Sequence, residues 1–123
     1  MKKLFLLFCV LTVITTISCV DLDNSDTSLS FSETEHDYSM EANFDQERMR
    51  DVEHYLDRKI GRRSHMSFVN LRHNGKLSLD DNTNFYLEKS NGHIEINLDK
   101  EENSNESYHR IKDMCEGIKE ILK

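Results

Sequence analysis

The centre of the sequence reads NFYLEKSNGHIEINL, residues 84–98, and this stretch decides the fold class. Apolar and polar residues alternate on both sides of Asn91-Gly92, which is the period of a β-strand with one buried face. Asn-Gly between two such runs is a strong hairpin signal, because a type I′ turn needs positive φ at both central residues. We therefore predict an antiparallel hairpin formed by residues 84–89 and 93–98.

A second Asn-Gly pair lies upstream and predicts a second hairpin. Asn74-Gly75 separates residues 66–73 from residues 76–80, and a polar Asx-type turn at 80–83 joins the two hairpins. In the first of these strands either Val69 and Leu71 or Met66 and Phe68 could face inward. The later strands are less ambiguous, and their alternation predicts a buried face made of Leu77, Leu79, Phe85, Leu87, Ile94, Ile96 and Leu98. The opposite face then carries Ser78, Tyr86, Glu88, Glu95 and Asn97.

Helical patterns flank this four-stranded meander. Residues 45–60 carry Met49, Val52, Leu56 and Ile60 at helical spacing, and Gly61 is expected to end that helix. A second helix is expected from about Glu106 to the C-terminus, with Tyr108, Ile111, Cys115, Ile118 and Leu122 along its apolar stripe. We predict a small two-layer α+β domain over residues 42–123, in the order α-β-β-β-β-α, with both helices on one face of the sheet.

The N-terminus has the pattern of a targeting segment. Lys2 and Lys3 precede an apolar run from Leu4 to Ile17, which is too short for a permanent membrane span and suits a secretory signal. The run ends in Thr16-Ile17-Ser18-Cys19, where a small residue precedes a cysteine.

This end of the run resembles the lipobox of bacterial lipoproteins, over residues 1–19. The resemblance implies removal of residues 1–18, a lipid on Cys19 and a membrane anchor through that lipid. Thr16 departs from the leucine usual at its position in the family. A plain secretory signal and an uncleaved N-terminal anchor are the alternatives.

Residues 20–41 hold seven acidic residues and no lysine or arginine. So much like charge with few large apolar groups favours an extended, solvated chain, so we predict an acidic disordered tether over residues 19–41. Acidic residues directly after a lipidated cysteine also resemble surface-export signals of some Gram-negative lipoproteins. The expected location is the cell envelope, at the outer membrane and exposed on the surface; a spacer with no addressing role is the alternative.

Charge and length limit the function classes. The 123 residues include 16 basic and 23 acidic ones, a net charge of −7, which argues against binding to nucleic acid. The six histidines lack the spacing of a helical zinc site, so no metal and no cofactor are predicted. Cys115 lies on the apolar helix stripe, where a core thiol is favoured over a nucleophile. No catalytic constellation is present, and we predict that the protein is not an enzyme.

The function predicted from these observations is that of a protein-binding module, of which an inhibitor or immunity-type protein is one form. The expected surface is the open sheet face with Tyr86, Glu88, Glu95 and Asn97. Arg58, Arg62 and Arg63 near the end of the first helix are a second candidate surface; compensation of the helix dipole is the alternative reading. The alternative function is glycan binding, with Tyr86 as the stacking residue, or an accessory role in a surface lipoprotein complex.

Overall fold

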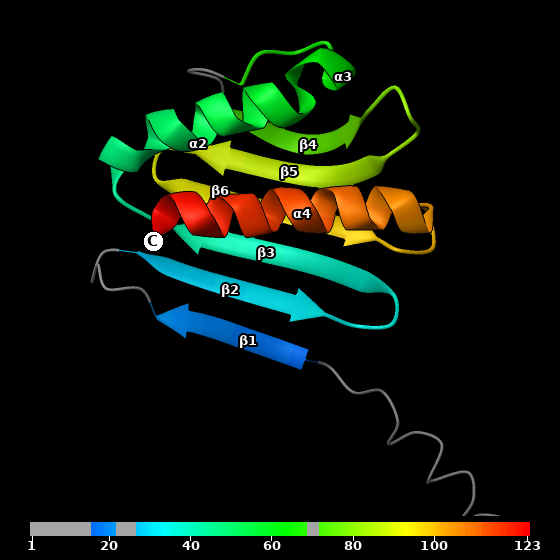
Figure 1. The fold of residues 1–123 in the computed structure, drawn as a ribbon, viewed down its shortest axis with the longest axis horizontal. Coiled ribbons are helices and arrows are strands. Elements are labelled where there is room, and N and C mark those ends of the chain that lie inside the picture. Colours follow the sequence, from blue (N-terminus) through cyan, green and yellow to red (C-terminus); the bar gives the residue numbers. More distant parts are fainter. Residues whose placement is uncertain (1–15, 22–26, 69–71) are drawn as a thin grey trace, which may run out of the picture.

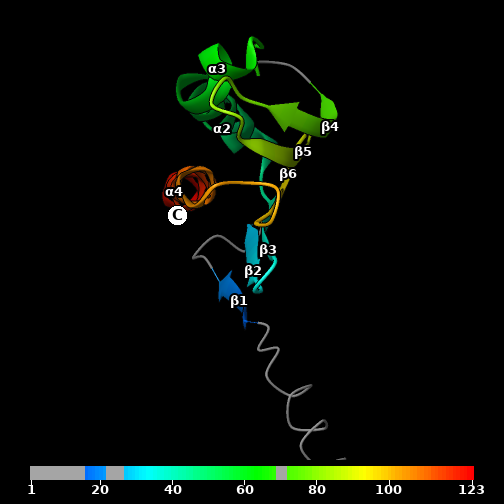
Figure 2. The same ribbon diagram turned by 90° about the vertical axis from the view of Figure 1, so that its right-hand side faces the viewer.

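The computed structural model of this chain describes residues 16–21, 27–68 and 72–123. It is an α+β fold in which a twisted antiparallel sheet is covered on one face by helices (Figures 1 and 2). The predicted fold class and the placement of both helical segments on one face are therefore confirmed. The sheet has six strands in the order β1-β2-β3-β6-β5-β4, where four were predicted.

The strands are β1 (Thr16–Asp21), β2 (Ser28–Glu33), β3 (Asp37–Asn43), β4 (His73–Ser78), β5 (Asn84–Ser90) and β6 (His93–Asp99). The helical segments are η1 (Gln46–Arg48), α2 (Met49–Leu56), the π-helical η2 (Asp57–Gly61), α3 (Arg62–Ser64) and α4 (Asn105–Leu122).

The hairpin of β5 and β6 confirms the prediction at the centre of the sequence. Ser90 pairs with His93 across the two-residue turn, and all seven residues of the predicted buried face are buried. The turn is not type I′, since Gly92 has a φ of 74° and Asn91 has no positive φ. Glycine is needed there, because a Cβ atom would lie 2.6 Å from the carbonyl oxygen of Phe44.

The predicted hairpin of residues 66–80 is wrong. Asn74 and Gly75 lie inside β4 instead of in a turn. Phe68 is fully buried, and its amide donates a hydrogen bond to Asp57 Oδ1 at 2.6 Å, so the chain at this point is bound to the helical layer. Val69 and Leu71 lie outside the described residues.

The predicted tether and the domain boundary at residue 42 are also wrong. β2 and β3 belong to the sheet, and β3 pairs with β6 over its whole length. Leu29, Tyr38, Met40 and Ala42 are buried on the helix-covered face. Acidic residues and serines occupy many of the alternating positions that face outward. The overall composition of the segment therefore concealed the two-residue period of its apolar residues.

Glu33 attaches this N-terminal part to the C-terminal part of the fold. Its carboxylate accepts hydrogen bonds from Lys100 Nζ at 2.8 Å and from the Tyr108 hydroxyl at 2.6 Å, and Lys112 Nζ lies 3.7 Å away. Burial raises the pKa of Glu33, but these hydrogen bonds and positive charges outweigh it and hold the pKa below its usual value. Glu33, which the composition of residues 20–41 had assigned to the tether, is thus part of the folded domain.

The first helical region runs on beyond Gly61, which was expected to end it. It continues through α3 and ends at His65, whose φ of 58° is the left-handed conformation that closes helices. Its α2 segment packs against α4 at Gly117, where an added Cβ would lie 1.8 Å from the Tyr55 hydroxyl oxygen. The absence of a side chain at Gly117 is what allows this close approach.

Helix α4 agrees with the sequence prediction. Ser104 caps it by accepting a hydrogen bond from the Ser107 amide at 3.1 Å, and Ile111, Cys115, Ile118 and Leu122 are buried. Within the described part of the chain, no helix is both long and apolar enough to cross a bilayer.

Candidate functional site

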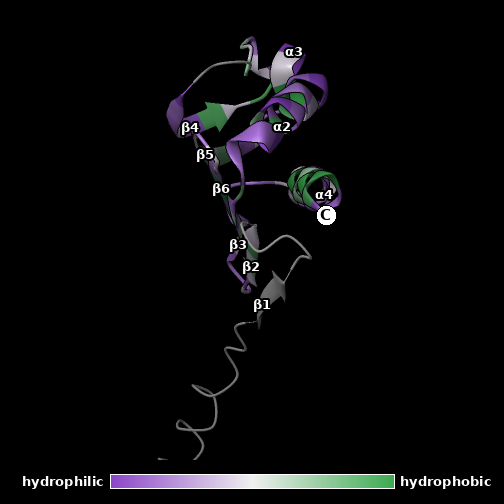
Figure 3. Ribbon diagram, turned by 90° about the vertical axis from the view of Figure 1, so that its left-hand side faces the viewer, coloured by the Kyte–Doolittle hydropathy of each residue, from purple (hydrophilic) through white to green (hydrophobic). Residues whose placement is uncertain are grey.

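The sheet has one face covered by the helices and one open face (Figures 2 and 3). Along β5 and β6 buried and half-buried residues alternate, so Tyr86, Glu88, Glu95 and Asn97 all project from the open face. The structure therefore brings together the four sheet residues that the sequence predicted as one surface.

Strand register places three glutamates in one row across the open face. Glu41 on β3 lies directly opposite Glu95 on β6, and Glu95 lies directly opposite Glu88 on β5. A second acidic pair, Asp37 and Asp99, is aligned in the same way at the end of β3 and β6. Like charges directly opposite each other destabilise a sheet, so this arrangement costs stability.

Positive charge on this face is scarce. Over the described strands β2 to β6, the single lysine among the outward positions is Lys76, which lies opposite Tyr86. None of the salt bridges among the described residues includes Glu41, Glu88 or Glu95. The row is therefore not neutralised within the part of the chain that the structure describes.

Burial and the neighbouring carboxylates both affect the pKa of Glu95. Partial burial raises the pKa of this carboxyl, and so do the hydrogen bond with Glu41 and the charges of Glu41 and Glu88. The Asn97 amide donates to Glu95 Oε2 at 3.3 Å and opposes the shift, but the net change is upward. Glu95 thus holds its proton to a higher pH than an isolated glutamate.

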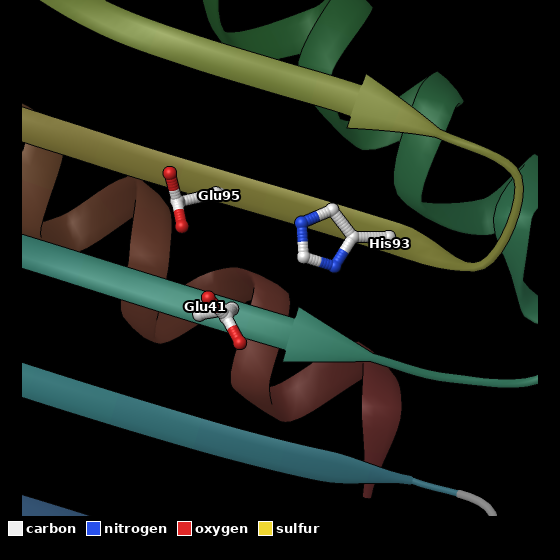
Figure 4. A group of neighbouring side chains, drawn as sticks. All are labelled: Glu41, His93 and Glu95. Carbon is white, nitrogen blue, oxygen red and sulfur yellow. The ribbon is translucent and has the colours of Figure 1, made fainter.

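His93, the first residue of β6, projects from the same face two positions before Glu95. A ligand atom from each of Glu41, His93 and Glu95 lies within 4.8 Å of the other two, and Figure 4 shows the imidazole edge turned toward the carboxylates. His93 Nδ1 lies 2.8 Å from Asn43 Oδ1. Sequence analysis missed this group because it assigned Glu41 to the tether. The alternation of Tyr38, Met40 and Ala42 is the signal that could have found it.

Tyr86 is one of the residues that line a depression on the same face. The depression has a volume of about 260 Å³, and Asp37, Lys76, Asn97 and Asp99 are among the residues that line it. The Tyr86 hydroxyl lies within hydrogen-bonding distance of Asn74 Oδ1 and 3.4 Å from Glu88 Oε2. These contacts of the hydroxyl restrain the orientation of the Tyr86 ring.

The predicted arginine surface lies elsewhere. Arg58, Arg62 and Arg63 are in the helical layer, on the other side of the sheet from the open face (Figure 2). Arg62 is exposed, and the Arg58 guanidinium lies 5.8 Å from the centroid of the Tyr55 ring. The two predicted surfaces are therefore separate.

Arg63 is partly engaged within the fold. Its Nη1 lies 3.9 Å from Asp81 Oδ2, and Arg110 Nη2 lies 2.8 Å from the same oxygen. Burial raises the pKa of Asp81, but hydrogen bonds from Thr83 and the two guanidinium groups lower it to below its usual value. The predicted Asx turn is present, with the Thr83 amide donating to Asp81 Oδ1 at 3.2 Å.

The two cysteines singled out from the sequence have different positions. Cys115 is fully buried, and burial raises the pKa of its thiol well above the ordinary value, as expected for a core residue. Cys19 lies in β1, at the edge of the sheet.

The chain matches no family model, no curated protein and no solved structure. Its function therefore has to be argued from the geometry of the open face.

Proposed function

We propose that this chain is a lipid-anchored protein of the bacterial cell envelope that binds another protein through the open face of its sheet. The observation that carries the proposal is the row formed by Glu41, Glu95 and Glu88 on three adjacent strands. An inhibitor or immunity-type protein is the form of binding module that we favour.

The charge of this face indicates the chemistry of the partner. The row weakens the sheet, and no lysine or arginine stands directly opposite any of its three carboxylates. A surface rich in lysine and arginine would relieve the repulsion and would be attracted over a distance. Phosphate groups would be repelled, which disfavours nucleic acid.

In this proposal, a lipid on Cys19 anchors the protein to the membrane. Eight residues, 20–27, separate Cys19 from β2. In the structure Cys19 pairs with Ser30 of β2, and even a fully extended segment of eight residues would span at most about 29 Å, so the sheet would stay close to the bilayer. Cleavage before Cys19 would also remove Thr16, Ile17 and Ser18 from β1.

A charge-reversal experiment tests the binding face. The variant Glu41→Lys/Glu88→Lys/Glu95→Lys is compared with the native chain and with the control Glu47→Lys/Glu106→Lys/Glu116→Lys, whose substituted residues are exposed in the helical segments. Proteins captured from envelope and secreted fractions are identified and then purified for direct binding measurements. We expect the open-face variant to lose at least about tenfold in affinity and the control to retain it. Equal binding by both variants would refute the assignment of this face.

Metabolic labelling tests the anchor. Cells are fed a clickable palmitate analogue, and the native chain is compared with Cys19→Ala. We expect label on the native chain and none on the variant. Protease treatment of intact cells then shows whether the domain is exposed on the cell surface. Label that is independent of Cys19, or no label, would contradict a lipid on this residue.

Glycan binding is a second candidate function, and the depression beside Tyr86 is the observation that favours it. The aromatic ring of Tyr86 can stack on a sugar, and neighbouring amide and carboxylate groups such as Asn97 and Asp99 can form hydrogen bonds with the sugar hydroxyl groups. A glycan array should then give a signal that Tyr86→Ala abolishes and Tyr108→Ala, on α4, retains.

A further inference from the structure

We propose that Glu41, His93 and Glu95 form a binding site for a divalent zinc ion on the open face of the sheet. The site is formed by residues of this chain and does not depend on the proposed protein partner. The sequence analysis predicted no metal site, because the three residues come together only when β3 pairs with β6.

The three side chains offer a mixed set of ligand atoms close enough to share one ion. Two carboxylates and an imidazole contribute atoms that lie within 4.8 Å of one another. Around a tetrahedral ion, zinc bonds of about 2.0–2.2 Å place two ligand atoms about 3.3–3.6 Å apart, so side-chain rotations that bring these atoms about 1 Å closer complete the contact. Glu41 is exposed and can make such a rotation (Figure 4).

The imidazole is oriented as a metal ligand should be. His93 Nδ1 lies 2.8 Å from Asn43 Oδ1, and because an amide oxygen only accepts, this contact favours the tautomer that has its proton on Nδ1 and leaves the lone pair of Nε2 available to an ion. Metal-binding histidines in proteins typically donate their other ring N–H to an oxygen in this way. Asn97 likewise donates to Glu95 Oε2 at 3.3 Å and restrains that carboxylate.

The backbone under the site is rigid. β3 pairs with β2 and β6, and β6 pairs with β3 and β5, so neither strand is at an edge of the sheet. Asn43 lies directly opposite His93, and Glu41 lies directly opposite Glu95. Two cross-strand pairs, which are neighbours on the open face, therefore supply the three ligands and the residue that orients the histidine.

The ligand types favour zinc over calcium and magnesium. Calcium and magnesium prefer oxygen ligands alone, whereas imidazole with carboxylate suits zinc. Three protein ligands leave at least one position open on a tetrahedral ion. Water would fill that position in the isolated protein, and a side chain of a bound protein could replace it.

Titration calorimetry of the full chain with zinc chloride, after treatment with EDTA and dialysis, tests the proposal. We expect one saturable site per chain. Glu41→Gln, His93→Ala and Glu95→Gln should each weaken binding by at least about tenfold, and Asn43→Ala by about 10–100-fold, since it acts through the orientation of His93. Magnesium chloride should give no saturable heat.

Matched controls separate this site from other zinc ligands of the chain. Glu47→Gln and His54→Ala remove an exposed carboxylate and an exposed imidazole in the helical layer, and Cys19→Ala removes the thiol that position 19 offers when the chain is produced without a lipid. All three should bind zinc like the native chain. Zinc should also raise the melting temperature of the native chain and leave that of His93→Ala unchanged. Absence of saturable binding, or binding unaffected by the three ligand variants, would overturn the site.

This experiment is independent of the partner experiment. Calorimetry uses the chain alone, whereas partner affinity can be measured in excess EDTA. If the chain binds a partner but does not bind zinc, the metal site is rejected and the proposed function stands. If the chain binds zinc but the open-face variant binds partners as well as the native chain does, the proposed function is rejected and the metal site stands.

Discussion

Two adjacent residues of β5 show that charged side chains have different surroundings on the two faces of the sheet. Lys89 points into the helix-covered core and is 3% exposed, and its Nζ lies 2.6 Å from Glu53 Oε2 on α2. Glu88 points to the open face, where the residue opposite it on β6 is Glu95. A buried charge requires a compensating partner, whereas water can solvate a surface charge. Each charge of the core pair therefore depends on the other, whereas the fold does not depend on the carboxylate row.

The largest expected effect is that of removing the buried lysine. Lys89→Met leaves the Glu53 carboxylate in the core without the Lys89 charge, and we expect a loss of about 3–5 kcal/mol in the free energy of unfolding. Urea denaturation measures it. The double variant Lys89→Met/Glu53→Leu should recover most of the loss, and Glu88→Gln on the opposite face should change little. A single Lys89→Met variant as stable as the native chain would remove the contrast between the two faces.

A smaller loss is expected where the helices that cover the sheet touch. Gly117→Ala places a methyl group against the Tyr55 hydroxyl, and although alanine favours the helix, we expect a net loss of about 1–2 kcal/mol. Thermal unfolding gives the change, with Glu116→Ala as the control at an exposed neighbouring position. Combination with Tyr55→Ala should be less than additive. Additive effects would mean that these two residues do not limit the helix approach.

Glu33 tests whether β2 is part of the folded unit. Glu33→Gln weakens the bonds to Lys100 and Tyr108, and we expect a loss of about 1 kcal/mol at pH 7. The pKa of Glu33 is lowered in the folded state, so its contribution is present above the ordinary glutamate range and disappears as the pH falls through the lowered pKa. The difference between variant and native stability should therefore shrink in acid.

Denaturation at several pH values measures this difference, and Glu35→Gln, at an exposed position of the β2–β3 turn, is the control. No loss at Glu33 would restore the tether interpretation of this segment.

The smallest expected effect has the opposite sign and concerns the carboxylate row. In EDTA at pH 7, Glu95→Gln should raise the free energy of unfolding by about 0.5 kcal/mol, because it removes like-charge repulsion and can keep the hydrogen bond with Glu41. Glu41→Gln should act similarly, and the double variant should gain less than the sum. A loss of stability in these variants would mean that the row supports the fold.

Much of the fold could be predicted from the sequence because the signals are local. The β5–β6 hairpin follows from alternation around Asn91-Gly92, and α4 follows from its apolar stripe and Ser104. The same alternation separated Tyr86, Glu88, Glu95 and Asn97 from the core. The prediction at Asn74-Gly75 was wrong because the preceding segment, at Phe68, is held by Asp57 in the helical layer instead of forming the first strand.

The candidate metal site and the buried ion pair could not be predicted in this way, because each joins residues far apart in the chain. Asn43 and His93 are 50 residues apart, and Glu53 and Lys89 are 36 apart. Local periodicity reports which side of a strand faces the core, but it contains no information about which strand lies alongside. The sequence by itself determined the β5–β6 hairpin, the two helical regions and their apolar faces; only the tertiary structure decided that β3 pairs with β6, and with that pairing which charges meet.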